Sequence, residues 1–171
     1  PHNHEVELQN GRRVRYDRLL LATGSVAAPT ASLNLTEELL EKIHAKGVKV
    51  VSLTLHVGRG TFLPIRTDDV AAHKMHEEYY DIPVATGHEI QQVKLEGRRV
   101  VAVGTTVTRA LEYAAQDIQQ AITQNLTGEA DIFIHPGYKF KLVEVLLTNF
   151  HAPDSTVIQL AAAFTGQDLL L

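Results

Sequence analysis

Cysteine is absent from this 171-residue chain. Its absence excludes disulfides, thiolate metal sites, iron–sulfur clusters and cysteine nucleophiles, and it is consistent with a reducing, cytoplasmic compartment. Long apolar runs are also missing, because residues 19–22 and 157–164 fall far short of the roughly 20 residues that cross a bilayer. No charged segment followed by an apolar stretch opens the chain, so the sequence indicates neither secretion nor a membrane location.

Basic residues do not dominate the chain: 16 Lys and Arg stand against 20 Asp and Glu, which gives a net charge of −4. A nucleic-acid partner would therefore need a local basic patch. Apolar residues make up 44% and charged residues 21%, as in soluble globular proteins, which excludes a disordered or fibrous chain. The chain starts at Pro1 and its one methionine is Met75, so we expect a piece of a longer protein.

Strand and helix patterns alternate along the chain. Residues 5–16 alternate around Asn10-Gly11, which is typical of a β-hairpin, because a type I′ turn needs positive φ at both central residues. Thr36 before Glu37-Glu38 predicts a capped helix. The other apolar patterns predict strands at 48–57, 79–83, 97–104, 130–135 and 143–147, and helices at 67–76, 111–122 and 155–166. Asp154 or Ser155 is expected to cap the last of these helices.

This alternation predicts an α/β fold with a mostly parallel sheet and flanking helices, preceded by the hairpin. We place one boundary near Gly24, so that residues 1–23 form the hairpin segment and residues 24–171 the α/β domain. Loops rich in Gly, Pro, Thr and His follow four predicted strands and begin at His56, Gly104, His135 and Thr148. Ligands bind outside the carboxyl ends of strands in open α/β sheets, so we expect these loops to converge on one crevice.

The segment Gly104-Thr105-Thr106 enters the longest predicted helix, whose free amides and positive end suit a carboxylate or a phosphate. Both hydroxyls and the Arg109 guanidinium could add donors. The alternative is an ordinary strand–helix turn, with Thr106 as the cap and Arg109 in solvent. The segment is not a P-loop, because the spaced glycines and the Gly-Lys-Ser/Thr ending are missing.

Nine histidines raise the question of a metal site. His73 and His76 lie three apart, but the order of residues around them matches neither common zinc-protease helix. Without cysteine, a site would also need His56, His135 or His151 to converge on them. We therefore expect no metal and assign histidines to hydrogen bonding or to acid–base work. A serine hydrolase is disfavoured too, because no Gly-x-Ser-x-Gly elbow is present.

Aromatic and basic residues interleave near the C-terminus, where Tyr138, Phe140 and Phe150 lie close to Lys139 and Lys141. Such rings can stack on unpaired bases while lysines meet phosphates, which predicts an RNA-binding patch. The alternative is a segment whose residues alternate between core and surface.

Six segments, in order over about residues 24–166, resemble the S-adenosylmethionine:tRNA ribosyltransferase-isomerase family of the queuosine pathway. They are Gly24-Ser-Val-Ala-Ala-Pro-Thr-Ala31, Leu55-His-Val-Gly-Arg-Gly-Thr-Phe62, His73-Lys-Met-His76, Ala102-Val-Gly-Thr-Thr106 with Arg109-Ala-Leu-Glu112, Phe133-Ile-His-Pro-Gly-Tyr-Lys-Phe140, and Leu147-Thr-Asn-Phe-His-Ala-Pro-Asp-Ser-Thr156. Each segment alone is a weak signal, but six in the family's order are specific.

The resemblance implies that the ribosyl group of S-adenosylmethionine is transferred and isomerised onto 7-aminomethyl-7-deazaguanine at the wobble position of tRNA. The product is epoxyqueuosine, and adenine and methionine are released. S-adenosylmethionine is thus the co-substrate, tRNA the partner and no metal is needed, in a cytoplasmic enzyme that we expect to be a monomer. In this family an α/β domain carries an inserted β-barrel, so the hairpin before Gly24 would be the barrel's tail.

The matched segments also supply the candidate site residues. We expect at least one histidine to act as acid or base, because its pKa lies near working pH, although the histidines could instead only brace loops. The four candidates are His56, His73, His76 and His151. Expected substrate-binding residues are Pro29, Thr30, Gly58, Gly60, Thr61, Phe62, Gly104, Thr105, Thr106, Arg109, Glu112, Pro136, Gly137, Tyr138, Asn149, Phe150, Ser155 and Thr156, and expected RNA-binding residues are Lys139 and Lys141.

The chain departs from the family pattern at several positions. Asn34 replaces a histidine, and Ala152 replaces a leucine. Arg59 stands where the family has leucine, and Leu63 stands where the family has arginine. The family's N-terminal region and aromatic C-terminal tail are absent from this sequence. These departures keep open a non-catalytic RNA-binding or degenerate relative, and an inactive isolated piece.

A second resemblance lies in residues 14–24, which are similar to the Tyr-Asp-x-Leu-(Leu/Ile)-x-Ala-Thr-Gly stretch of FAD-dependent pyridine-nucleotide oxidoreductases. That stretch is short and mostly apolar, and the chain has no Gly-x-Gly-x-x-Gly. A flavoprotein is therefore the less favoured interpretation.

Overall fold

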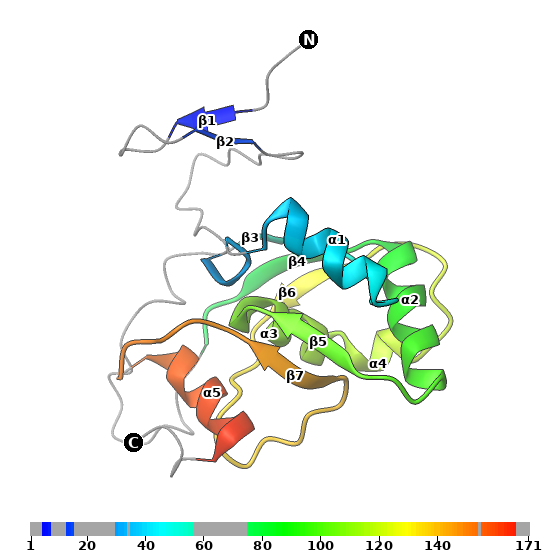
Figure 1. Cartoon of the computed structure of the whole chain (residues 1–171). Coiled ribbons are helices and arrows are strands. Elements are labelled where there is room, and N and C mark those ends of the chain that lie inside the picture. The colour runs from blue at the N-terminus through cyan, green and yellow to red at the C-terminus, as the bar shows by residue number, and fades with distance from the viewer. Residues whose placement is uncertain are drawn as a thin grey trace.

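The computed structural model describes residues 5–7, 13–15, 30–33, 35–56, 75–153 and 155–166 (Figure 1). The predicted hairpin is confirmed as an antiparallel pair of β1 (Glu5–Glu7) and β2 (Arg13–Arg15), in which Val6 lies opposite Val14. Its Asn10-Gly11 turn and the predicted boundary near Gly24 lie outside the described residues.

The predicted helix caps are confirmed at both ends of the chain. After the 3₁₀ turn η1 (Thr30–Ser32), helix α1 (Glu37–Ala45) begins where the Thr36 hydroxyl accepts a hydrogen bond from the Leu39 amide at 3.2 Å. Helix α5 (Thr156–Thr165) begins at Ser155, whose hydroxyl accepts from the Ile158 amide at 3.3 Å. Each hydroxyl satisfies one of the amides that a helix leaves free at its first turn.

One sheet is antiparallel and has three strands in the order β3 (Thr54–His56), β4 (Glu78–Ile82) and β6 (Leu126–Ala130). Tyr80 lies opposite Leu55 on one side and Gly128 on the other. A Cβ at Gly128 would lie 2.9 Å from the Tyr80 hydroxyl, so only glycine lets the ring lie across this strand.

The other sheet is a parallel pair, β5 (Val100–Val103) and β7 (Val143–Leu147). At their carboxyl ends the Gly104 amide donates to the Leu147 carbonyl at 2.9 Å, so the loops that leave the two strands begin side by side. Gly104 has a φ of 108°, a value that L side chains rarely adopt. Helix α3 (Thr105–Tyr113) follows directly, and α4 (Ala115–Ile118) continues after a break at Ala114.

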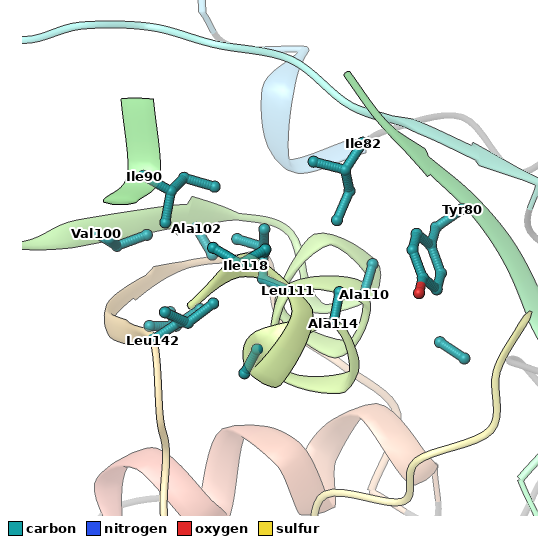
Figure 2. Close-up of a cluster of buried hydrophobic side chains, with 13 residues drawn as sticks. Tyr80, Ile82, Ile90, Val100, Ala102, Ala110, Leu111, Ala114, Ile118 and Leu142 are labelled. Carbon is teal, nitrogen blue, oxygen red and sulfur yellow. The ribbon is translucent and has the colours of Figure 1, made fainter. Parts of the chain in front are cut away.

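Helix α3 lies at the centre of the core. Figure 2 shows Ala110, Leu111 and Ala114 between the side chains of the antiparallel sheet, with Tyr80 labelled, and those around the parallel pair, with Ala102 labelled. The buried residues of this cluster are Tyr80, Ile82, Ile90, Val100, Ala102, Ala110, Leu111, Ala114, Ala115, Ile118, Ala130, Leu142 and Val143. The small side chains of α3 and α4 let backbones approach closely, so movement of α3 would be felt in both sheets.

The α/β class with flanking helices is confirmed, but the prediction of a mostly parallel sheet is wrong. Within the described ranges, β3, β4 and β6 pair antiparallel, and only β5 and β7 pair parallel. Strand β4 pairs with β6 and β5 with β7, so strands that follow one another in the chain are not always neighbours. A helix between two strands predicts a parallel pair only when those two strands become neighbours in one sheet, and here several consecutive strands do not.

Some predicted boundaries are also wrong. The predicted strand at 48–57 is confirmed only at Thr54–His56, and the β-branched Val48, Val50 and Val51 before it are about 45% exposed. The predicted strand at 130–135 is wrong, because β6 ends at Ala130. Beyond that residue the Arg109 side chain, and not a neighbouring strand, donates to the Ile132 carbonyl. Helix α2 (Val84–Leu95) was not predicted, because its apolar residues do not gather on one face.

Candidate active site

Helix α3 connects several of the predicted functional loops. Arg109 contacts the chain before β4 and after β6, Glu112 contacts the segment before β7, and Gly104 opens the helix beside the end of β7. Helix α3 thus links the loops that begin at Gly104, His135 and Thr148, and convergence of all four loops on one crevice stays a prediction, because residues 57–74 after His56 lie outside the described residues. Several predictions lie outside the described residues. They are the site residues Pro29, Gly58, Gly60, Thr61, Phe62 and His73, the departures Asn34, Arg59 and Leu63, and residues 67–74 of the helix predicted at 67–76, whose last two residues, Met75 and His76, are not helical.

Arg109 is buried, with 3% of its surface exposed. Its Nε donates to the Ile132 carbonyl at 3.1 Å, and its Nη2 donates to the carbonyls of His76 at 3.2 Å and Ala130 at 2.9 Å. Its Nη1 forms an ion pair with the Glu78 carboxylate at 2.9 Å. The guanidinium thus joins β4 to the end of β6, and the alternative of a solvated Arg109 is wrong.

Burial lowers the pKa of Arg109, while the negative charge of Glu78 and its side-chain interaction with Arg109 raise it. An arginine remains protonated in proteins because its ordinary pKa lies above about 12. Arg109 is therefore charged, and its contacts make it a structural tie between β4 and the end of β6. Glu78 was not predicted as part of the site, although an acid among the inward residues Tyr80 and Ile82 of a strand is a signal that could have identified it.

Glu112 lies one turn after Arg109 and is fully buried. Its Oε1 accepts hydrogen bonds from the amides of Leu142 and Val143, both at 2.9 Å. Its Oε2 accepts from the Lys141 amide at 2.8 Å and from the Tyr138 hydroxyl at 3.1 Å. Four donors match the four acceptor positions of an ionised carboxylate, so the group is well satisfied without solvent.

Tyr138 points inward with its hydroxyl on Glu112. Burial, and then the charge of Glu112 and its hydrogen bond, raise the pKa of Tyr138, so the phenol stays protonated at neutral pH. Its ring lies edge-on to Phe140 at 5.1 Å, and Phe140 packs on Phe164 of α5 at 3.9 Å. Lys139 and Lys141 alternate with these rings and are exposed, which is the core-and-surface alternation that the sequence allowed.

The first turn of α3 has no side-chain cap within the described part of the chain, since its N-cap residue is Gly104. The alternative in which Thr106 caps the helix is therefore wrong. Thr105 is buried and Thr106 half-buried, behind amides that point out of the helix end. Partial positive charge at this end favours an anion.

His151 lies in the loop after β7, close in the chain to the Leu147 carbonyl that Gly104 binds. Its Nε2 is 2.9 Å from the Thr148 hydroxyl, and burial lowers its pKa, so the imidazole is neutral near pH 7. Of its predicted neighbours, Asn149 and Phe150 are exposed. Ser155 is buried and caps α5, and Thr156 is buried in the first turn of α5.

The other predicted residues are more dispersed. His56 is exposed, with its ring edge-on to Tyr79 at 5.1 Å, on the side of the sheet opposite the buried Tyr80. His76 is exposed, and its carbonyl accepts from Arg109. Thr30 lies in η1, while Pro136 and Gly137 form a turn in which the Tyr138 amide donates to the His135 carbonyl.

The described residues contain no group of three or more His, Asp or Glu side chains that could hold a metal ion. None of the helices in these ranges has the length and apolar character needed to cross a membrane.

Comparison with known proteins gives consistent matches. The sequence model of a family described as "Queuosine biosynthesis protein" matches residues 5–171. The S-adenosylmethionine:tRNA ribosyltransferase-isomerase of Chlorobaculum parvum is 64% identical over 148 residues, which cover 86% of this chain and 44% of the relative. That of Pelodictyon phaeoclathratiforme is 60% identical over 148 residues, 86% of this chain and 43% of the relative.

A solved structure is similar as well. The crystal structure of an S-adenosylmethionine tRNA ribosyltransferase from Thermotoga maritima superposes with a TM-score of 0.65 at 39% identity, over 82% of this chain and 43% of that one. The chain therefore spans less than half the length of the relatives that it matches.

Proposed function

The chain belongs to the queuosine biosynthesis protein family, and we propose that it forms the part of an S-adenosylmethionine:tRNA ribosyltransferase-isomerase that brings the two substrates together. The six-segment resemblance is confirmed by this membership. The match includes residues 14–24, so that stretch belongs to this family and does not favour a flavoprotein. The reaction proposed is transfer and isomerisation of the ribosyl group of S-adenosylmethionine onto 7-aminomethyl-7-deazaguanine at the wobble position of tRNA.

The observation that supports this proposal most is the hydrogen bond from the Gly104 amide to the Leu147 carbonyl. It puts the glycine–threonine turn beside the loop that carries His151, at the carboxyl ends of two parallel strands. Ligands of α/β proteins bind at such places. The uncapped first turn of α3 would hold the methionine carboxylate of S-adenosylmethionine or a phosphate through the amides of Thr105 and Thr106.

His151 is the strongest of the four histidine candidates for acid–base work. The chemistry needs a proton removed beside the sulfonium and a proton delivered to the departing adenine. A histidine with a lowered pKa is unprotonated at neutral pH, so it can accept the first of these protons. His56, His73 and His76 remain candidates for the second.

The RNA partner would meet the exposed side of residues 138–150. Lys139 and Lys141 present two charges there, and Phe150 is fully exposed and available to stack on an unpaired base. We further propose a cytoplasmic monomer, in which β1 and β2 are the tail of an inserted barrel and residues 24–171 form the α/β domain.

The test is single-turnover reaction of the full-length protein with labelled S-adenosylmethionine and tRNA that carries the precursor base. The expected result is label in the tRNA together with one adenine released per modified base. Transfer RNA without the aminomethyl group is the control and should stay unlabelled. If tRNA binds but neither adenine nor labelled tRNA is produced, the non-catalytic alternative is correct.

A further inference from the structure

Helix α3 carries two buried charges one turn apart, and they bind to different parts of the protein. Arg109 holds the ends of β4 and β6, whereas Glu112 holds residues 138–143. Within the described ranges, Glu112 forms an ion pair with no Lys, Arg or His. Its charge is balanced only by hydrogen-bond donors, three of which are consecutive backbone amides.

Such an arrangement requires one particular backbone conformation of the segment that binds Glu112. A buried ionised carboxylate is costly unless its oxygens are hydrogen-bonded, and the amides of Lys141, Leu142 and Val143 can all reach it only in one backbone path. Convergent backbone amides of this kind form an anion-binding concavity. Here the anion comes from the protein itself, so the carboxylate determines the path of the segment.

The path of the segment determines in turn which side chains face outward. Tyr138 and Leu142 are directed inward, the first by its hydroxyl on Glu112 and the second by burial beside it. Lys139 and Lys141 alternate with them and are therefore exposed. A looser segment would let both ammonium groups sample many positions, which would weaken their joint contact with two phosphates.

We infer that Glu112 is a positioning residue for tRNA binding: it touches no substrate, but it holds Lys139 and Lys141 in the arrangement that meets the RNA backbone. This inference rests on the proposed function and reassigns Glu112 from the substrate-binding residues expected from the sequence. It predicts that Glu112 affects the affinity for tRNA and leaves both the chemical step and S-adenosylmethionine binding unchanged.

The test is Glu112→Gln in the full-length enzyme, with Glu129→Gln as the control that removes the same charge from an exposed position. Glutamine keeps one acceptor oxygen and turns the other into a donor that faces the amides. Loss of about one of the two lysine–phosphate contacts in the loosened segment predicts roughly a tenfold higher KM for tRNA at unchanged kcat. The affinity for S-adenosylmethionine should not change, and the amides at 141–143 should exchange hydrogen faster.

Two results would overturn the inference. One is an unchanged KM for tRNA despite faster exchange at 141–143. The other is a parallel loss of kcat, S-adenosylmethionine binding and stability, which a general structural role would produce. The exchange measurement needs no turnover, so it remains informative even if the enzyme proves to be non-catalytic.

A second variant applies if Glu112→Gln does not fold. Tyr138→Phe removes one of the four donors and keeps the ring, so the amides at 141–143 should exchange hydrogen faster and the KM for tRNA should rise by about twofold to threefold. Both changes together support the inference, and an unchanged KM for tRNA contradicts it, whether or not the exchange at 141–143 is faster.

Discussion

Replacing Arg109 by methionine tests whether a buried charge ties α3 to β4 and β6 of the antiparallel sheet. The change keeps an unbranched side chain of similar length but removes every donor of the guanidinium. Glu78, which is 1% exposed, then loses its arginine, and the buried Ala130 carbonyl loses its 2.9 Å donor. The carbonyls of His76 and Ile132 are only partly buried, and water can replace their donors.

The magnitude follows from these two losses. Removing one partner of a buried ion pair costs about 3–5 kcal/mol, and an unsatisfied buried carbonyl costs about 1–3 kcal/mol more. We expect the free energy of unfolding to fall by about 5 kcal/mol, a large share of the roughly 5–15 kcal/mol typical of a folded domain. The free energy of unfolding of Arg109→Lys should lie between those of the wild type and the methionine variant, because lysine keeps the charge but lacks the planar guanidinium.

The assay is urea unfolding followed by far-UV circular dichroism, since the chain has no tryptophan. The matched control is Arg98→Met, because Arg98 pairs with Glu96 at 3.3 Å on the surface, where both side chains are more than 40% exposed. Exposed pairs contribute about 0–1 kcal/mol. If the two methionine variants lose the same stability, Arg109 does not tie α3 to β4 and β6 as described.

Three further results are expected. Alanine at both Lys139 and Lys141 should weaken tRNA binding and lower the slope of log affinity against log salt by about 2, with S-adenosylmethionine affinity unchanged in calorimetry. Because burial lowers the pKa of His151 from 6.5, its imidazole protonates only below that pH; the acid limb of the single-turnover rate should lie below pH 6.5, and His151→Gln should remove it. Gly128→Ala should cost about 1–3 kcal/mol in urea unfolding, because its Cβ would meet the Tyr80 hydroxyl, whereas an unchanged midpoint would show that the ring can move aside.

Local signals in the sequence predicted local structure well. Thr36 and Ser155 were identified as helix caps, and the alternating residues 5–16 as a hairpin, because each depends on neighbours in the chain. Strand direction was not predictable in this way. It depends on which strands become neighbours, and β4 and β6 pair although four other elements, α2, β5, α3 and α4, lie between them in the chain.

In the candidate site, too, features set by neighbours in the chain were predictable and features set by distant contacts were not. The glycine and threonines at 104–106 were expected at a helix start, and α3 begins there. The side chains of Arg109 and Glu112 were expected on substrates, since a charged residue after a glycine turn suggests a ligand. Both turn instead to partners more than 20 residues away in the chain, and no local pattern reveals such distant carbonyls and amides.

The exposed segment before β3 has a consequence for handling the protein. Val48, Val50 and Val51 form an apolar strip with high strand propensity that belongs to neither sheet. Two side-chain interactions attach this segment to α2. The Thr86 hydroxyl donates to the Ser52 carbonyl, and Lys49 forms an ion pair with Glu89. An open strip of this kind is a template for pairing between molecules, and Lys49 puts a charge in its middle that opposes such growth. Replacing Lys49 by an apolar residue would therefore lengthen the apolar strip and favour association of the chain in concentrated solution.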